Sequence, residues 1–302
     1  MLQHVVLCWA IAAWMSVGIA SVSAIEGKLL PATAPVADRL TVFGDSYSDS
    51  RPMFPFPKWS EQVLDRGHVR WLRSFARGGS TANDLGRDGN TEFTFRTQVD
   101  QFARNPGLRR DRDVMAIYFG QIDIARYNYP ETADLGRAKA DYKRHLDRLI
   151  ALGATAGNRR VLLLLAPDRL FNRRDAAIMR QRTQQWNHWL TALAAGRRHV
   201  DIVDLFGAVD RVRANPRLYG LTNITTPDPL RHATTALFYD ASHFGRRGHE
   251  IIGSVFARTL TTLATPSAAR WPSAWRMVPD TGTQPDARPG EILAFSTAPE
   301  NR

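Results

Sequence analysis

Residues 40–50, LTVFGDSYSDS, pass from a short apolar run through a glycine into a polar segment. A short, continuous apolar run is typical of a strand that is buried on both faces of a parallel sheet. In such a sheet, the loops that follow the carboxyl ends of the strands form the crevice where ligands bind. Ser46 lies in such a loop, three residues after the predicted strand. Taken alone, the segment fits either a loop that presents a nucleophile or a polar turn rich in capping residues.

The same kind of apolar run recurs along the chain and alternates with segments of helical period. The alternation predicts an α/β fold, a three-layer α/β/α sandwich with about five parallel strands. Strands are predicted at 40–43, near 72–76, and at 114–119, 161–166 and 200–203. Helices are predicted near 57–65, 97–104, 133–152, 175–193 and 246–263.

The amino-terminal segment has the composition of a targeting sequence. Residues 1–24 contain no Lys, Arg, Asp or Glu, include the apolar run VVLCWAIAAWM and end in SVSA. This pattern predicts a signal peptide that is cleaved after Ala24, and therefore a secreted protein. A membrane anchor is the alternative, although the apolar run is short for a membrane span. Residues 25–38 are interpreted as a leader into the first strand.

The carboxyl-terminal segment also departs from the alternating pattern. Residues 265–302 are rich in Pro, Ser, Thr and Ala and show no sustained period. They are interpreted as a loose tail, or as a strap held on the surface by Trp271 and Trp275. Residues 39–264 therefore form the predicted domain.

Charge and cysteine content restrict the class of protein. The net charge is +11, and none of it comes from the predicted signal peptide. Scattered arginine pairs without interleaved aromatic residues or a recognised motif argue against nucleic-acid binding, and favour a solvated surface that could contact anionic surfaces. The single cysteine, Cys8, lies in the predicted signal peptide, so we expect no disulfide in the mature chain.

Asn223 begins a sequon that a eukaryotic host could glycosylate. We expect a monomer.

A second polar segment, YDASH at residues 239–243, supplies what a serine nucleophile would need. A base must take the proton of the serine, and a carboxylate must orient that base. Asp240 and His243 lie three positions apart, so one short segment can provide both groups. His249 is expected to have a structural role. The other histidines show no pairing at metal-ligand spacing, and Asp240, His243 and His249 are better explained by the roles above, so we expect no metal.

Four segments together resemble the GDSL family of serine esterases and lipases, within the SGNH hydrolases, over roughly residues 38–263. The similar segments are FGDSYSDS, with Tyr47 where the family name has leucine, SFARGGSTAND, DVMAIYFGQIDIARY and YDASHFGRRGHEIIG. The resemblance implies an SGNH or flavodoxin-like fold and a secreted carboxylic-ester hydrolase that needs no cofactor. It assigns Ser46 as nucleophile, His243 as base and Asp240 as partner of the base. The implied substrate is a small-molecule, lipid or glycan ester.

The resemblance also assigns an oxyanion hole, and here the sequence departs from the family. Ser46 and Gly79 take the positions of two backbone donors, but Ile122 stands where the family has a donating asparagine. Loss of one such donor typically lowers turnover by about 10²–10³-fold. Either Gln121 replaces the donor, or the backbone groups act alone and leave a slow enzyme or a glycan- or lipid-binding protein.

Several other residues leave alternatives open. Asp45 and Asp123 are expected to brace the active-site loops rather than to act as acids. The aromatic residues Tyr127, Tyr129 and Phe244 could line a substrate pocket or pack in the core. An acyltransferase that uses an alcohol in place of water would need the same residues as a hydrolase.

Overall fold

The fold is described from a computed structural model of the 302-residue chain. The structure describes residues 26–51, 54–107, 110–125, 135–168, 175–230 and 234–264. All of them lie in the first of two compact units, Met1–Thr265, and the second unit is Pro266–Arg302. The predicted signal peptide, the predicted tail with Trp271 and Trp275, and the residues Tyr127 and Tyr129 lie outside the described residues.

Five parallel strands form one sheet with the order β2-β1-β3-β4-β5. The strands are β1 (Ala37–Gly44), β2 (Val69–Ser74), β3 (Asp113–Tyr118), β4 (Arg160–Leu164) and β5 (Val200–Val203). The register is continuous across the centre of the sheet, where Val42 of β1 pairs with Ser74 of β2 and with Ala116 of β3. The prediction of an α/β fold with five parallel strands is therefore confirmed.

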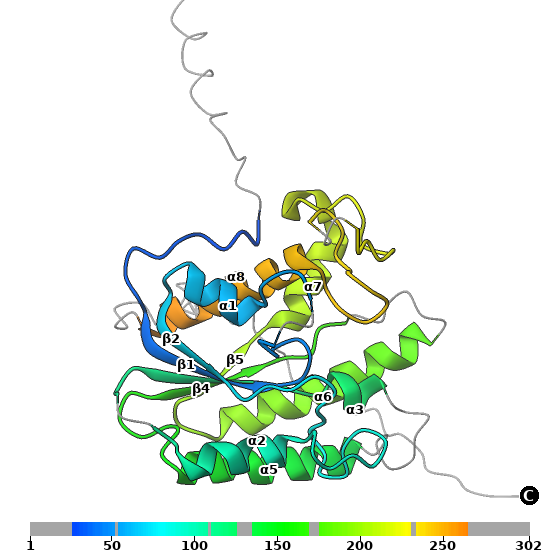
Figure 1. The fold of residues 1–302 in the computed structure, drawn as a ribbon. Helices are drawn as coiled ribbons and strands as arrows, with labels where there is room; N and C mark the ends of the chain where they lie inside the picture. Colours follow the sequence, from blue (N-terminus) through cyan, green and yellow to red (C-terminus); the bar gives the residue numbers. More distant parts are fainter. Residues whose placement is uncertain are drawn as a thin grey trace, which may run out of the picture. The chain divides into compact units, whose positions relative to one another are not determined.

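Helices cover both faces of this sheet (Figure 1). On one face lie α1 (Trp59–Asp65), α7 (Leu205–Ala214) and α8 (Arg246–Ala264), and on the other lie α2 (Phe95–Arg104), α5 (Leu135–Ala151) and α6 (Ala176–Ala195). The short helix α3 (Gln121–Ala125) follows β3, and a 3₁₀ turn, η1 (Pro216–Tyr219), follows α7. The molecule is thus a three-layer sandwich.

Side chains of the central strands alternate between two apolar cores. On β3, Ala116 and Tyr118 belong to the core beneath α1, α7 and α8, whereas Met115 and Ile117 belong to the core above α2, α5 and α6. All four are at most 1% exposed. Because both faces are covered, the strand has no polar face, which explains why the sequence shows a continuous apolar run rather than an alternating one.

Two strand starts and one helix differ most from the predictions. Strand β2 begins at Val69, three residues earlier than predicted, because it is an edge strand whose Trp71 is 59% exposed and which therefore lacks a continuous apolar run. Strand β1 begins at Ala37, inside the predicted leader. Helix α7 was not predicted, although Asp204 caps it by accepting a hydrogen bond from the N–H of Gly207.

The order of the strands determines where a ligand site can form. The chain passes from β1 outward to β2 and then returns to place β3 on the other side of β1. The carboxyl ends of β1 and β3 therefore lie next to each other at the point where the strand order reverses, which is the crevice used by ligands in open α/β sheets. Ser46 follows β1, and Gly120 and Gln121 follow β3.

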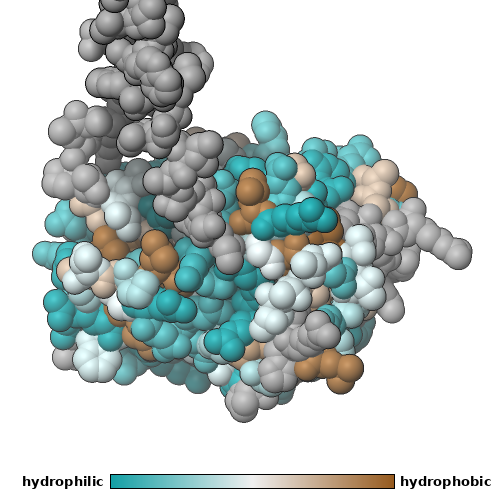
Figure 2. Space-filling view, turned by 90° about the horizontal axis from the view of Figure 1, so that it is seen from above, coloured by the Kyte–Doolittle hydropathy of each residue, from teal (hydrophilic) through white to brown (hydrophobic). Residues whose placement is uncertain are grey.

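The face of the molecule on the side of α1, α7 and α8 is largely polar (Figure 2). Seen from the side of α1, α7 and α8, hydrophilic residues predominate and hydrophobic ones form small separate groups (Figure 2). None of the helices in the described part of the chain is long and apolar enough to cross a membrane.

Candidate active site

Ser46 is held in a tight turn at the carboxyl end of β1. The backbone carbonyl of Asp45 accepts hydrogen bonds from the N–H groups of Ser48 and Asp49, both at 3.0 Å. The Asp45 side chain, which is completely buried, accepts a further hydrogen bond from the N–H of Tyr47 at 3.0 Å. Ser46 itself is 9% exposed, so the turn leaves it little freedom.

Ser46, His243 and Asp240 form one hydrogen-bonded chain. Oγ of Ser46 lies 2.9 Å from Nε2 of His243, although the two residues are 197 positions apart in the sequence. Nδ1 of the same ring lies 2.8 Å from Oδ2 of Asp240. A carboxylate accepts hydrogen bonds, so Nδ1 carries the ring proton, and Nε2 is left as the acceptor that faces the serine.

The backbone of its own segment orients the Asp240 carboxylate. Oδ1 accepts hydrogen bonds from the N–H groups of Ser242 at 2.7 Å and His243 at 2.8 Å. Burial acts to raise the pKa of Asp240, but the hydrogen bonds from the His243 ring and from these N–H groups outweigh it and hold the pKa below its ordinary value. Asp240 is therefore ionised at neutral pH and can stabilise a protonated imidazole.

Tyr47 connects the serine turn to the histidine segment. Its hydroxyl donates to the carbonyl of Ser242 at 2.6 Å, and its ring centroid lies 5.6 Å from that of His243. Phe244 packs edge-on against Tyr47 at 5.5 Å and is only 1% exposed. Of the two alternatives for Phe244, the structure therefore favours packing in the core.

The loop that contains Gly79 is tied to the serine turn by Asp49. The N–H of Gly78 donates to the Asp49 carboxylate at 2.7 Å, and the guanidinium of Arg51 pairs with the same carboxylate. Burial acts to raise the pKa of Asp49, but the hydrogen bonds from Arg51 and Gly78 lower it below its ordinary value. Gly79 has a φ of +84°, a conformation that favours glycine, and an added Cβ would meet no atom within 4 Å. Gly79 thus lies beside open space.

Asp123, on α3, connects the segment after β3 to the same loop. Its fully buried carboxylate accepts hydrogen bonds from the N–H of Ala82 at 2.9 Å and from the side-chain amide of Asn83 at 2.7 Å. Burial raises the pKa of Asp123, although these hydrogen bonds act in the opposite direction. The two loops that flank Ser46 are therefore joined by buried contacts.

Residues 42–251, more than half of the chain, match the sequence model of the GDSL-like Lipase/Acylhydrolase family. The chain belongs to this family. Members of the GDSL-like family are hydrolases that act on ester bonds, which agrees with the function class predicted from the sequence.

Solved structures of similar fold include GDSL proteins and other esterases. A member of the lipolytic G-D-S-L family from Veillonella parvula is 15% identical, with 74% of this chain and 99% of that chain covered and a TM-score of 0.51. Axe2, an acetylxylan esterase from Geobacillus stearothermophilus, is 17% identical, with 76% and 97% covered and a TM-score of 0.48. At such identities the likeness concerns the fold alone. No curated protein sequence is significantly similar to this chain.

The departure from the GDSL pattern lies at the start of α3. Gly120 has a φ of +108°, and an added Cβ would lie 2.5 Å from the indole nitrogen of Trp186, so only glycine fits between β3 and α3. Gln121 is 4% exposed, and its amide donates to the hydroxyl of Tyr118 at 3.4 Å. Ile122 is half-buried and has no group that donates a hydrogen bond.

Gln98, a residue at the site that the sequence did not indicate, lies on α2. Its side-chain oxygen accepts from the N–H of Gly44 at 2.9 Å, and its nitrogen donates to the Gly44 carbonyl at 2.8 Å and to Oγ of Ser80 at 3.1 Å. Gln98 therefore joins the end of β1 to the Gly79 loop. A single glutamine on the buried face of a helix gives no sequence signal for such a role.

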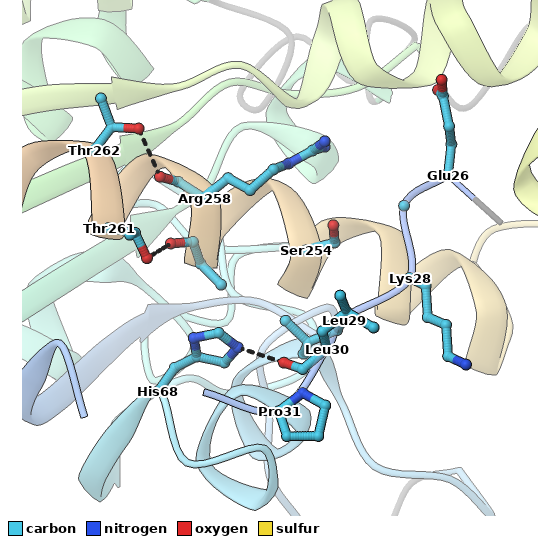
Figure 3. Close-up of a pocket in the computed structure, with 12 residues that line it drawn as sticks. Glu26, Lys28, Leu29, Leu30, Pro31, His68, Ser254, Arg258, Thr261 and Thr262 are labelled. Carbon is cyan, nitrogen blue, oxygen red and sulfur yellow. Dashed lines mark hydrogen bonds between the residues drawn. The ribbon is translucent and has the colours of Figure 1, made fainter. Parts of the chain in front are cut away.

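A separate groove lies between the segment 26–31 and α8 (Figure 3). It has a volume of about 700 Å³ and is lined by residues such as Leu29, Leu30 and Ala257. None of the residues that line it belongs to the Ser46–His243–Asp240 chain. Among the described residues, no group of three or more His, Cys, Asp or Glu side chains could hold a metal ion.

Proposed function

We propose that the protein is a secreted serine carboxylic-ester hydrolase that works through an acyl-enzyme intermediate. The observation that supports this proposal is the continuous hydrogen-bonded chain from Ser46 through His243 to Asp240, with contacts of 2.9 and 2.8 Å. The spacing matches the reach that a nucleophile, its base and an orienting carboxylate require.

The geometry suggests the order of proton transfers. His243 takes the proton of Ser46 at Nε2 as Oγ attacks the ester carbonyl, and Asp240 stabilises the imidazolium that results. His243 then gives this proton to the departing alcohol oxygen as the ester C–O bond breaks. In the second half, His243 takes a proton from water, the hydroxide attacks the acyl carbon, and Ser46 regains the proton as it leaves.

The negative oxygen that forms in each half needs hydrogen-bond donors. We assign the N–H groups of Ser46 and Gly79 to this role, with Gln121 as a further donor that would have to turn from Tyr118 toward the site. Asp45 and Asp123 act as supports, since each accepts hydrogen bonds from the loops that present these donors.

Location and modification belong to the same proposal. Residues 1–24 have the composition of a signal peptide, which favours secretion, and the basic surface favours contact with anionic surfaces. Glycosylation at Asn223 would require its side-chain nitrogen to give up the hydrogen bond that it donates to the carbonyl of Thr226 at 2.9 Å. The proposed substrate is a small-molecule, lipid or glycan ester, and the proposed state is a monomer.

Labelling and hydrolysis can test the proposal together. The purified protein would be treated with a fluorophosphonate and assayed on p-nitrophenyl esters of increasing acyl length, beside Ser46→Ala. Because Ser46 supplies the attacking oxygen, the variant should lose the label and at least about 10³-fold of the turnover. The exposed Ser50, four residues away, provides a matched control, and Ser50→Ala should label and hydrolyse as the wild type does.

Two other results of these assays would lead to a different proposed function. A wild-type protein that takes no label and exceeds Ser46→Ala on no ester would overturn the hydrolase proposal and favour a glycan- or lipid-binding protein. Transfer of the acyl group to an added alcohol in preference to water would instead identify an acyltransferase, which product analysis would show.

A further inference from the structure

Lys58 is a buried lysine beside the proposed active site. It immediately precedes α1 and is only 1% exposed. Its ammonium lies 4.1 Å from the ring centroid of Phe54 and 5.7 Å from that of Phe56. No acceptor among the described residues takes a hydrogen bond from this ammonium. The ammonium therefore lies over the faces of two aromatic rings, which attract a cation.

Phe54 contacts both this ammonium and the ring of the proposed base. Its ring centroid is 5.0 Å from that of His243, and it packs edge-on against Tyr239 at 5.3 Å. Tyr47 contacts the same imidazole at 5.6 Å. The His243 ring thus has two aromatic neighbours, and one of them, Phe54, is in contact with the Lys58 ammonium.

An ammonium that is largely removed from water lowers the free energy of unfolding unless other contacts compensate. Burial lowers the pKa of Lys58 to about 8, although Glu61 and Asp49 act to raise it, so the side chain is still mostly charged at neutral pH. Its positive charge adds to the burial that keeps the pKa of His249 well below its ordinary value. A methionine at position 58 would fill the same space without the free-energy cost of burying a charge. The presence of a charged lysine here therefore requires an explanation other than stability.

We propose that Lys58 is a positioning residue for His243: its ammonium binds the face of Phe54 and holds that ring against the imidazole of the base. This inference rests on the proposed function. An imidazole that is free to turn would spend less time with Nε2 toward Ser46, and small displacements of a catalytic group reduce the rate of the chemical step more than they reduce substrate binding.

Steady-state kinetics on the best p-nitrophenyl ester can test this role. Lys58→Met keeps the length of the side chain but removes the charge, and should lower kcat about 10-fold while KM stays within about twofold. Lys58→Arg retains a cation that stacks on aromatic rings and should restore most of kcat. Lys139→Met is the matched control, because its ammonium lies over the ring of Trp189 in a different part of the fold, and it should leave kcat unchanged.

A double-mutant cycle with Phe54→Leu separates positioning from a general structural role. If Lys58 acts through Phe54, the double variant should be no slower than Phe54→Leu alone. Lys58→Met should also melt at the same or a higher temperature than the wild type, so a slower and more stable variant supports positioning. An unchanged kcat in Lys58→Met, or effects of the two substitutions that multiply, would overturn it.

An NMR measurement keeps the inference testable without turnover. The proton on Nδ1 of His243, which faces Asp240, should give a low-field resonance in the wild type that broadens in Lys58→Met and returns in Lys58→Arg. If the wild type hydrolyses no ester, the proposed function fails but this measurement still decides the role of Lys58. An identical resonance in all three proteins would show that Lys58 does not position the ring.

Discussion

At the scale of the residue, Ile122 determines how well the proposed oxyanion would be held. It takes the position of a donating asparagine in the family pattern but cannot donate a hydrogen bond. If no side chain supplies this donor, we expect Ile122→Asn to raise kcat about 10-fold or more, because the new donor would stabilise the charge that develops on the carbonyl oxygen. Ester hydrolysis by the two proteins, compared at saturating substrate, measures this change.

Gln121→Ala provides the complementary measurement for the same question. If Gln121 supplies the missing donor, Gln121→Ala should lower kcat about 10²-fold, and Ile122→Asn should then gain little in the wild-type background. If Gln121 only pairs with Tyr118, its removal should alter stability more than kcat. A rate that neither substitution alters would show that the backbone donors suffice.

Individual residues of the site differed in how far the sequence could predict them. Ser46, Asp240 and His243 stood out because their chemical types fit one reaction, and the fold brings Ser46 to within 2.9 Å of His243. Lys58 could not be recognised, because a lysine before a helix is usually solvated and only the packing of Phe54 and Phe56 shows that this one is buried. The orientation of the Gln121 amide likewise depends on contacts that no spacing encodes.

At the scale of the element, the fully buried strands were predicted most accurately. Strands β3 and β4 are buried on both faces, so their continuous apolar runs identified them to within two residues. The edge strand β2 is covered less completely, and its start was misplaced. The short helix α3 was also missed, because five residues are too few to show a helical period.

Helix α2 offers a test of how an element positions the site. Gln98→Leu would leave the buried N–H of Gly44 without its acceptor, at a cost of about 1–3 kcal/mol, and would free the loop that contains Ser80. We expect a lower melting temperature and a kcat reduced about 10-fold. Gln101→Leu, on the exposed side of the same helix, is the control. Equal effects of both substitutions on kcat would argue against a specific contact between α2 and the site.

At the scale of the whole molecule, the sandwich could be predicted because its signal is repeated many times. Each of the five strands and most of the helices contributes an apolar run or a period, so errors at single boundaries do not alter the fold. The site depends on a few contacts between segments that are far apart in the sequence, and each of these occurs once. The free energy of unfolding of the whole domain also depends on residues near the site. The burial of the charged Lys58 is one such contribution, and it can be measured because it changes with pH.

The buried charge of Lys58 predicts how the stability of the whole domain changes with pH. The pKa of Lys58 is about 8 in the folded protein and ordinarily 10.5. Between these values the unfolded chain binds the proton and the folded protein does not, so the free energy of unfolding rises with pH by a contribution on the order of 3 kcal/mol. Below pH 8 both states are protonated, and the full cost of burying the charge remains.

Denaturant unfolding at pH 7, 8, 9 and 10 would measure this contribution. Lys58→Met should be more stable than the wild type at pH 7, and the difference should shrink as the wild-type lysine loses its proton in the folded state. The arginine of Lys58→Arg stays protonated throughout this range. Like Lys58→Met, this variant should therefore lack the rise in stability that the wild type shows between pH 8 and 10. If the three stability curves ran parallel from pH 7 to 10, the Lys58 ammonium would be as well solvated in the folded protein as in the unfolded chain.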